Sequence, residues 1–176
     1  MPRKMKVTSV REVYRCPLFW VTEEEATNGA GHEIKRAIVR HGGSAVILLV
    51  DEKKRVLLVR QYRLPAGQFL WELPAGKLDE GEKPLQTAKR ELKEETGYKA
   101  GKWSKLVSYY ASPGFVAEKM NVFLAENPVA GEPSPMEDEQ IETRWFSGKE
   151  MDELIRNGQI LDGKTLAGYL LWKRYR

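Results

Sequence analysis

The sequence predicts an α+β fold in which a mixed sheet is sandwiched between helices and a small antiparallel β segment precedes it. Short apolar or alternating runs bounded by Gly, Asn and Pro fill the first part of the chain and its middle, as is typical of strands. One amphipathic segment separates the strand groups, and two more close the chain. With 176 residues, of which 41% are hydrophobic, the chain can bury a core of its own.

Residues 1–41 are predicted to form a β appendage and residues 42–176 the main domain. Alternation over residues 5–13 and the apolar run PLFWV at 17–21 indicate two short strands. A turn containing Gly and Asn at 28–31 then leads to a third strand near 34–40.

The main domain opens with two strong strand signals. SAVILLV at 44–50 and RVLLVRQY at 55–62 are joined by a short polar turn, which predicts a hairpin inside the core sheet. Further strands are expected at 69–73, 104–111, 119–125 and 142–146.

Three helices are expected. The first runs from 83 to 96, with Pro84 in its first turn, Gly97 at its C-terminal end and a buried stripe of Leu85, Ala88 and Leu92. Ser147 and Glu150 form a capping box that opens a helix reaching about residue 157. The last helix occupies 163–175, and its inward residues are expected to be Leu166, Tyr169, Leu170 and Trp172.

Composition narrows the class of protein. The 29 Lys and Arg residues against 25 Asp and Glu give a net charge of +4, and the basic residues are scattered, so no nucleic-acid partner is expected. The basic N-terminus is followed by no apolar h-region and no stretch approaches 18 apolar residues, so we expect neither a signal peptide nor a membrane span and a cytoplasmic protein. Cys16 is the only cysteine, which excludes an intrachain disulfide.

Glu91, Glu94 and Glu95 fall on a single helical turn. Like charges at these spacings destabilise a helix by roughly 0.2 to 0.5 kcal/mol per pair. Hard divalent cations bind to carboxylate oxygens, and carboxylates that converge on one helix face no longer repel each other once such cations lie between them. The plainer interpretation is a solvated acidic face, which does not account for Gly76 or Ala75 in the preceding turn.

The spacing around these glutamates carries a resemblance. Gly76, Glu82 and the run from Arg90 to Tyr98 match G-x5-E-x7-R-E-U-x-E-E-x-G-U, where U is a bulky apolar residue. This pattern resembles the Nudix box of hydrolases that cleave a nucleoside diphosphate linked to another moiety. The resemblance implies an α/β/α fold and two or three Mg²⁺ ions per site, with Mn²⁺ as an alternative. The implied metal ligands are Glu91 and Glu95, then Glu94, Glu82 and the Ala75 carbonyl, and Arg90 is implied to support a neighbouring carboxylate.

A second resemblance concerns the substrate. Pro113 follows Gly97 by 16 positions, and RQYR, WELPAGK and YYASPGF around the box are similar to the Nudix subgroup that acts on ADP-ribose. The subgroup implies a homodimer that exchanges N-terminal segments. The residues implied to bind substrate are Arg63 on a phosphate, Glu72 on ribose hydroxyls or the adenine edge, Lys35 and Arg36 on the ligand of the neighbouring subunit, and Pro113, Gly114 and Glu118 in the loop.

Hydrolysis also needs a group that orients or deprotonates the attacking water. The subgroup places it on a glutamate in a loop after the box, here the acidic stretch 134–142, with Glu139 preferred and Glu137 and Glu142 as alternatives. The resulting expectation is Mg²⁺-dependent hydrolysis of ADP-ribose to AMP and ribose 5-phosphate. Two alternatives stay open: another nucleoside diphosphate sugar as substrate, and a non-catalytic protein that senses a nucleotide.

Overall fold

The computed structural model describes residues 4–134 and 140–175, and the chain divides into two compact units. The first unit comprises residues 1–43 and 110–119, and the second comprises 44–109 and 120–176. The segment 110–119 therefore belongs with the N-terminal residues, which the sequence did not lead us to expect. Within the described part of the chain, no helix has the length and apolar character needed to span a bilayer.

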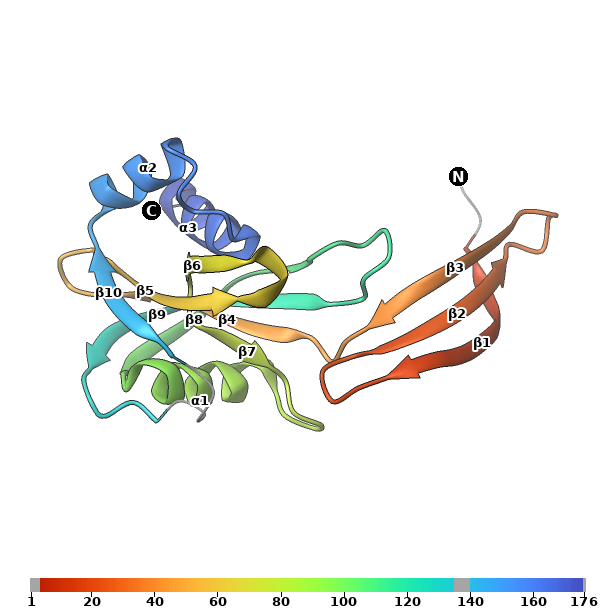
Figure 1. Ribbon diagram of the computed structural model, residues 1–176, viewed down its shortest axis with the longest axis horizontal. Helices are drawn as coiled ribbons and strands as arrows, with labels where there is room; N and C mark the ends of the chain where they lie inside the picture. Colours follow the sequence, from red (N-terminus) through yellow and green to blue (C-terminus); the bar gives the residue numbers. More distant parts are fainter. Residues whose placement is uncertain (1–3, 135–139, 176) are drawn as a thin grey trace. The chain divides into compact units, whose positions relative to one another are not determined.

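The first unit contains a three-stranded antiparallel sheet in the order β1-β2-β3 (Figure 1). Its strands are β1 Lys6–Arg15, β2 Trp20–Thr27 and β3 Glu33–Arg40. The prediction that the second strand begins at residue 17 was wrong. Pro17 has no N–H to donate to a sheet, and a tight turn in which the Cys16 N–H donates to the Phe19 carbonyl at 2.9 Å precedes the strand.

Backbone hydrogen bonds attach the segment 110–119 to β3. The Val39 N–H donates to the Phe115 carbonyl and the Ala117 N–H donates to the Val39 carbonyl, both at 2.8 Å. Val39 and Val116 consequently form an isolated parallel bridge. Because this pairing joins residues far apart in sequence, local patterns could not predict it.

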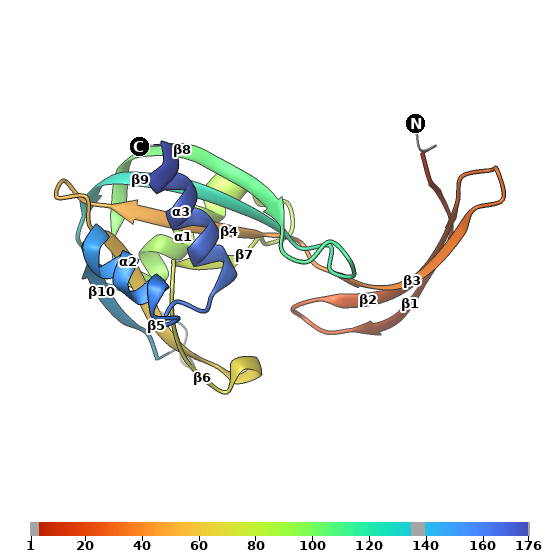
Figure 2. The same ribbon diagram turned by 90° about the horizontal axis from the view of Figure 1, so that it is seen from above.

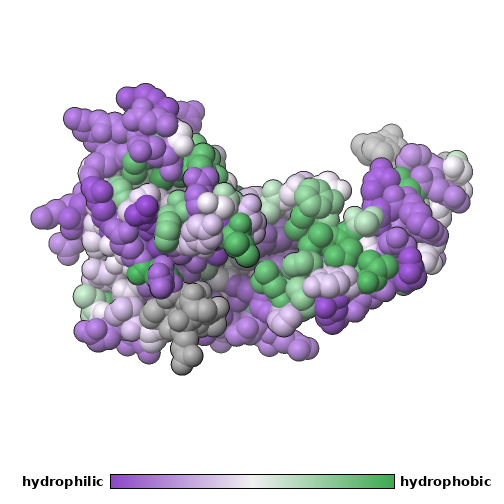
Figure 3. Space-filling model, viewed as in Figure 1, coloured by the Kyte–Doolittle hydropathy of each residue, from purple (hydrophilic) through white to green (hydrophobic). Residues whose placement is uncertain are grey.

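The outer strand of this sheet is exposed along its whole length. All ten residues of β1 are exposed, and among them are the apolar side chains of Val7, Val10, Val13 and Tyr14. Figure 3 shows hydrophobic residues interspersed with hydrophilic ones on the surface of this unit. An exposed edge strand that carries such apolar side chains among charged ones is a surface on which another chain can pair.

The second unit is built on a seven-stranded mixed sheet. The strand order is β10-β5-β4-β9-β8, with β6 paired to β5 and β7 paired to β4. Strand β4 runs parallel to β9 and antiparallel to β5 and β7, which makes the sheet mixed. The bounds are β4 Ser44–Val50, β5 Val56–Arg63, β6 Gln68–Glu72, β7 Ala75–Lys77, β8 Lys99–Tyr110, β9 Lys119–Val129 and β10 Glu142–Phe146, and a short 3-10 turn covers Leu64–Ala66.

Helices cover both faces of this sheet, so the predicted α+β sandwich is confirmed. Helix α1 (Pro84–Thr96) lies on one face, and α2 (Gly148–Arg156) and α3 (Gly163–Tyr175) lie on the other (Figures 1 and 2). Successive residues of β4 point to opposite faces, so both of its sides are buried. Ala45, Ile47 and Leu49 join α1 in one core cluster, and Val46, Leu48 and Val50 join α2 and α3 in the other.

Two predicted inward residues are exposed. Leu85 is 37% exposed because the buried side of α1 is centred on Thr87, Ala88, Leu92, Glu95 and Thr96, which turns the first leucine away from the sheet. Leu170 is 48% exposed because α3 buries Thr165, Gly168, Tyr169 and Trp172 on its opposite side. Strand β7 was also missed, because three residues are too few to show a period.

Gly97→Ala is expected to cost about 2 to 5 kcal/mol in the free energy of unfolding. Gly97 ends α1 with φ +74°, and a Cβ there would lie 2.3 Å from the backbone oxygen of Gly131. Urea denaturation would measure the change. Gly158→Ala is the matched control, since Gly158 has φ +67° and no atom lies within 4 Å of the place a methyl group would take. Its loss of unfolding free energy should come only from placing alanine in the left-handed backbone conformation. Equal losses in the two variants would contradict the close approach.

Candidate metal and diphosphate site

The turn before α1 and the acidic face of α1 lie against each other. Strand β7 pairs with β4, which places Gly76 opposite Ala45. A Cβ on Gly76 would lie 2.0 Å from Cδ of Glu91, so only glycine leaves room for that carboxylate beside the turn. One helical turn later, Oε2 of Glu95 accepts a hydrogen bond of 3.2 Å from the Ala75 N–H. The structure thus brings Ala75, Gly76, Glu91 and Glu95 together.

Arg90 lies among the carboxylates of this face. Its Nη1 donates to Glu91 Oε1 at 2.7 Å and to Glu94 Oε2 at 3.0 Å. Its Nη2 donates to Glu82 Oε2 at 3.0 Å and to the Lys77 carbonyl at 3.3 Å. One guanidinium therefore orients three predicted ligands and ties them to the end of β7.

The contact with Arg90 keeps Glu82 ionised. The hydrogen bond from Arg90 lowers the pKa of Glu82 to about 2, against a smaller opposing effect of burial and with help from the Thr87 hydroxyl. The same pair raises the pKa of Arg90, because its hydrogen bond to Glu82 favours the charged guanidinium. At neutral pH Glu82 is thus a carboxylate, the form in which its oxygens bind cations.

The donor set suits a hard divalent cation. Glu82, Glu91, Glu94 and Glu95 contribute only oxygen donors, and the missing side chain of Gly76 leaves the backbone of the turn accessible to the Glu91 carboxylate. In residues 4–134 and 140–175 no group of three or more His, Cys, Asp or Glu is arranged as a ready set of ligands. Arg90 lies among the carboxylates of this face, and its guanidinium pairs with Glu82, Glu91 and Glu94.

The predicted phosphate and ribose residues pair with each other. Arg63 Nε and Nη2 donate to Glu72 Oε1 and Oε2, both at 2.8 Å, in a bidentate pair. Glu72 lies on the same side of the sheet as α1. The pKa of Arg63 is raised mainly by its hydrogen bond to Glu72, against the lowering effect of burial, and the charge of Glu95 adds a smaller increase. The pair therefore lies within electrostatic range of the acidic face.

Other predicted substrate residues belong to the first unit. Arg36, Pro113 and Gly114 line one hollow of about 470 Å³ together with Tyr110 and Phe115. Two more predicted side chains lie elsewhere in the unit: Lys35 pairs with Glu25 at 2.9 Å, and Glu118 lies 3.8 Å from Nδ1 of His41. The strand alternation that separates Lys35 from Arg36 explains why only Arg36 reaches the hollow.

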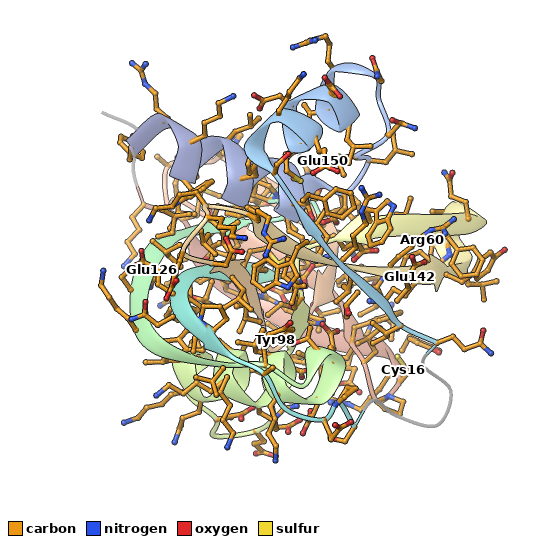
Figure 4. The ribbon with its side chains drawn as sticks, turned by 90° about the vertical axis from the view of Figure 1, so that its left-hand side faces the viewer. Cys16, Arg60, Tyr98, Glu126, Glu142 and Glu150 are labelled. Carbon is orange, nitrogen blue, oxygen red and sulfur yellow. The ribbon has the colours of Figure 1, made fainter. Side chains whose placement is uncertain are left out.

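The three candidate bases fall in different places. Glu137 and Glu139 lie outside the described residues. Glu142 begins β10, and its Oε2 accepts a 3.4 Å hydrogen bond from Arg60, beside which Figure 4 places it. Both side chains point to the face of the sheet that carries α2 and α3, whereas the acidic face of α1 is on the other side. The Ser134 N–H, at the start of the acidic stretch, donates to the Glu94 carbonyl at 2.9 Å.

Sequence reasoning missed Lys164. Its ammonium group contacts Glu72 Oε2 and lies 3.0 Å from Asp162 Oδ1, and its side chain is only 9% exposed. A lysine near a helix N-terminus matches no motif, and the one local signal available was Asp162, a residue type suited to capping that lies two positions earlier. No local signal connects it with Glu72, 92 positions away.

Comparisons with known proteins identify the family and related enzymes. The model of the NUDIX domain matches residues 39–167. ADP-ribose pyrophosphatase of Bacillus subtilis (strain 168) is 40% identical over 148 residues, which are 83% of this chain and 79% of that protein. GDP-mannose pyrophosphatase of Escherichia coli O139:H28 is 39% identical over 143 residues, 75% of this chain and 74% of that protein. A crystal structure of an ADP compounds hydrolase has a TM-score of 0.82 at 21% identity and covers 98% of this chain and 94% of its own, which shows the shared fold.

Proposed function

This chain belongs to the Nudix family of hydrolases, and from that premise we propose that it hydrolyses the pyrophosphate bond of ADP-ribose to AMP and ribose 5-phosphate. The observation that carries the proposal is the arrangement of four glutamates around Gly76 and Arg90, beside the Arg63–Glu72 pair. The 40% identical ADP-ribose pyrophosphatase supports the choice of substrate.

Nudix hydrolases generally use divalent metal ions, and Mg²⁺ is the proposed ion, two or three per site, with Mn²⁺ as the alternative. Such ions, when bound, supply positive charge to the diphosphate oxygens and activate the attacking water. Glu91 and Glu95 are the proposed principal ligands, with the Ala75 carbonyl opposite them. Glu94 would serve a further ion and Glu82 a looser contact.

The chain's own side chains perform the remaining tasks. Arg90 holds Glu82, Glu91 and Glu94 in fixed rotamers, which reduces the rearrangement needed for binding. Arg63 presents a guanidinium fork, which suits bidentate recognition of a phosphate. Since Glu72 is committed to Arg63 and Lys164, we assign it the role of holding Arg63 rather than the contact with ribose hydroxyls or the adenine edge that the resemblance implied.

The proposed catalytic base is a glutamate of the acidic stretch 134–142. Glu142 pairs with Arg60 on the far face of the sheet, which supports Glu139, or Glu137, over Glu142. The backbone bond between Ser134 and Glu94 supports this choice too, because it starts the stretch beside the acidic face. Glu139→Gln should therefore lower kcat more than Glu142→Gln does.

Substrate recognition from the first unit and dimer formation are linked proposals. The exposed edge strand β1, with four apolar side chains open to solvent, supports pairing of two chains through their N-terminal segments. Lys35 and Arg36 would reach the nucleotide bound by the neighbouring chain, and Pro113, Gly114 and Glu118 would contact the nucleotide from their loop. Sedimentation or light scattering at several concentrations would give the oligomeric state.

Product analysis tests the proposed function. The purified chain is incubated with ADP-ribose and Mg²⁺, and chromatography is expected to show AMP and ribose 5-phosphate in equal amounts, with none formed in EDTA. GDP-mannose is tested in parallel, because a GDP-mannose pyrophosphatase is among the relatives. The ratio of the two kcat/KM values decides whether ADP-ribose or another nucleoside diphosphate sugar is the preferred substrate. Binding of either compound without any product would favour a nucleotide sensor and contradict the enzyme.

A further inference from the structure

Four charged side chains of alternating sign form a continuous row in the second unit. The row runs from Arg63 through Glu72 and Lys164 to Asp162. Arg63 donates twice to Glu72 at 2.8 Å, Lys164 donates to Oε2 of the same carboxylate, and Lys164 lies 3.0 Å from Asp162. The two cations and two anions balance, so the row adds no net charge to the interior.

The middle of the row is buried, and the Arg63 end is partly exposed to solvent. The side chain of Glu72 is 2% exposed and that of Lys164 is 9% exposed, whereas that of Arg63 is 40% exposed. Arg63 uses Nε and one hydrogen of Nη2 on Glu72. A guanidinium has five N–H groups, so those of Nη1 and the second of Nη2 form another edge that can receive an anion. Among the four residues, Arg63 is thus the one that can meet a ligand.

Lys164 stabilises the carboxylate that orients this arginine. A buried carboxylate is costly unless its oxygens are paired, and Lys164 provides the second cation for Glu72 Oε2. Burial alone would raise the pKa of Glu72, but the hydrogen bond from Arg63 and the charge of Lys164 outweigh it and leave the pKa lowered. The carboxylate therefore keeps both oxygens as acceptors, which the bidentate geometry of Arg63 requires.

The start of α3 fixes Lys164 in turn. Asp162 Oδ2 accepts hydrogen bonds from the Thr165 N–H at 3.0 Å and from its hydroxyl at 2.6 Å. The Thr165 Oγ1 accepts a 2.7 Å bond from the N–H of Leu73, the residue after Glu72. This capped helix end is therefore attached to the strand that carries Glu72, three residues before Ala75.

We propose that Lys164 is a positioning residue for diphosphate recognition, which acts by holding Glu72 so that the free edge of Arg63 points to the bound anion. The proposal rests on the proposed function only in taking a diphosphate as the ligand. Lys164 itself does not touch the substrate in this arrangement, because its ammonium is buried against Glu72 and Asp162.

Binding of methylenediphosphonate with Mg²⁺, measured by calorimetry, tests this directly because the probe cannot be hydrolysed. Lys164→Met is expected to raise the Kd for methylenediphosphonate about tenfold, as is usual when a charge-assisted contact is lost. Lys164→Arg keeps the charge and should lie closer to the wild type. Lys173→Met is the matched control, since Lys173 is on the same helix but half exposed and paired with Asp152. Equal Kd values for Lys164→Met and the control would overturn the proposal.

A double-mutant cycle separates positioning from general loss of structure. In an Arg63→Met background, Lys164→Met should weaken the probe no further, because its effect passes through the arginine. A further tenfold loss in that background would overturn the proposal. With ADP-ribose, Lys164→Met should raise KM about tenfold and change kcat by no more than about threefold, the pattern of lost uniform binding.

The remaining outcomes are also decisive. A wild type that binds methylenediphosphonate but forms no AMP contradicts the proposed function alone, while a wild type that does not bind the probe overturns the present inference. If Lys164→Met does not fold, the double variant Glu72→Gln/Lys164→Met is compared with Glu72→Gln. The glutamine removes the buried carboxylate, so the loss of Lys164 no longer leaves a buried charge unpaired. Equal Kd values support action through Glu72, and a weaker double variant overturns it.

Discussion

Glu95→Gln is expected to reduce kcat on the order of 1000-fold with the fold intact. Glu95 is 5% exposed on the sheet-facing side of α1 and is one of the two proposed principal metal ligands. The amide replaces one anionic oxygen by a nitrogen that cannot bind Mg²⁺, while its remaining oxygen can still accept the hydrogen bond from the Ala75 N–H. The loss should therefore fall on turnover and not on packing.

Turnover of ADP-ribose across a Mg²⁺ titration measures this effect, and urea denaturation in EDTA checks the fold. The free energy of unfolding is expected to change little, because removing one charge also relieves repulsion within the acidic turn. Glu153→Gln on the exposed side of α2 is the control and should behave as the wild type. Wild-type turnover by Glu95→Gln at every Mg²⁺ concentration would contradict the metal assignment.

Gly76→Ala is expected to lower kcat about 100-fold through the position of one carboxylate. The new methyl group would lie 2.0 Å from Cδ and Oε1 of Glu91 and 2.6 Å from its Cγ. These atoms end a flexible side chain, so Glu91 can turn aside at little cost to stability. The turned carboxylate, however, no longer faces the backbone of Ala75 and Gly76.

The test compares activity with stability. We expect Gly76→Ala to unfold within about 1 kcal/mol of the wild type but to need more Mg²⁺ for half-maximal turnover. Gly148→Ala is the control, because a methyl group there meets its nearest atom, the Tyr169 hydroxyl, at an ordinary 3.6 Å. A Gly76→Ala variant with unchanged Mg²⁺ dependence would show that Glu91 need not lie against this turn.

Much of the fold was predictable because its signals are local. The buried run at 44–50 and the strand at 142–146 were predicted with the bounds the structure has, since the first is apolar throughout and the second ends at the helix cap Ser147. The Ser147–Glu150 capping box is present, with the Glu150 N–H donating to Ser147 Oγ at 3.2 Å. The inward faces of α1 and α3 were predicted less well, because the position of the sheet decides which leucines are covered.

The sequence by itself determined the acidic turn of α1, the glycine before it and the family to which they belong. These depend on residue spacing along one helix and one turn, and helical periodicity is a local property. Only the tertiary structure decided which groups join that turn: Arg63, Glu72 and Lys164 come from two strands and a distant helix, with Glu72 and Lys164 separated by 92 positions. The partner of a buried charge is chosen by the packing of the whole sheet and its helices, which no local pattern records.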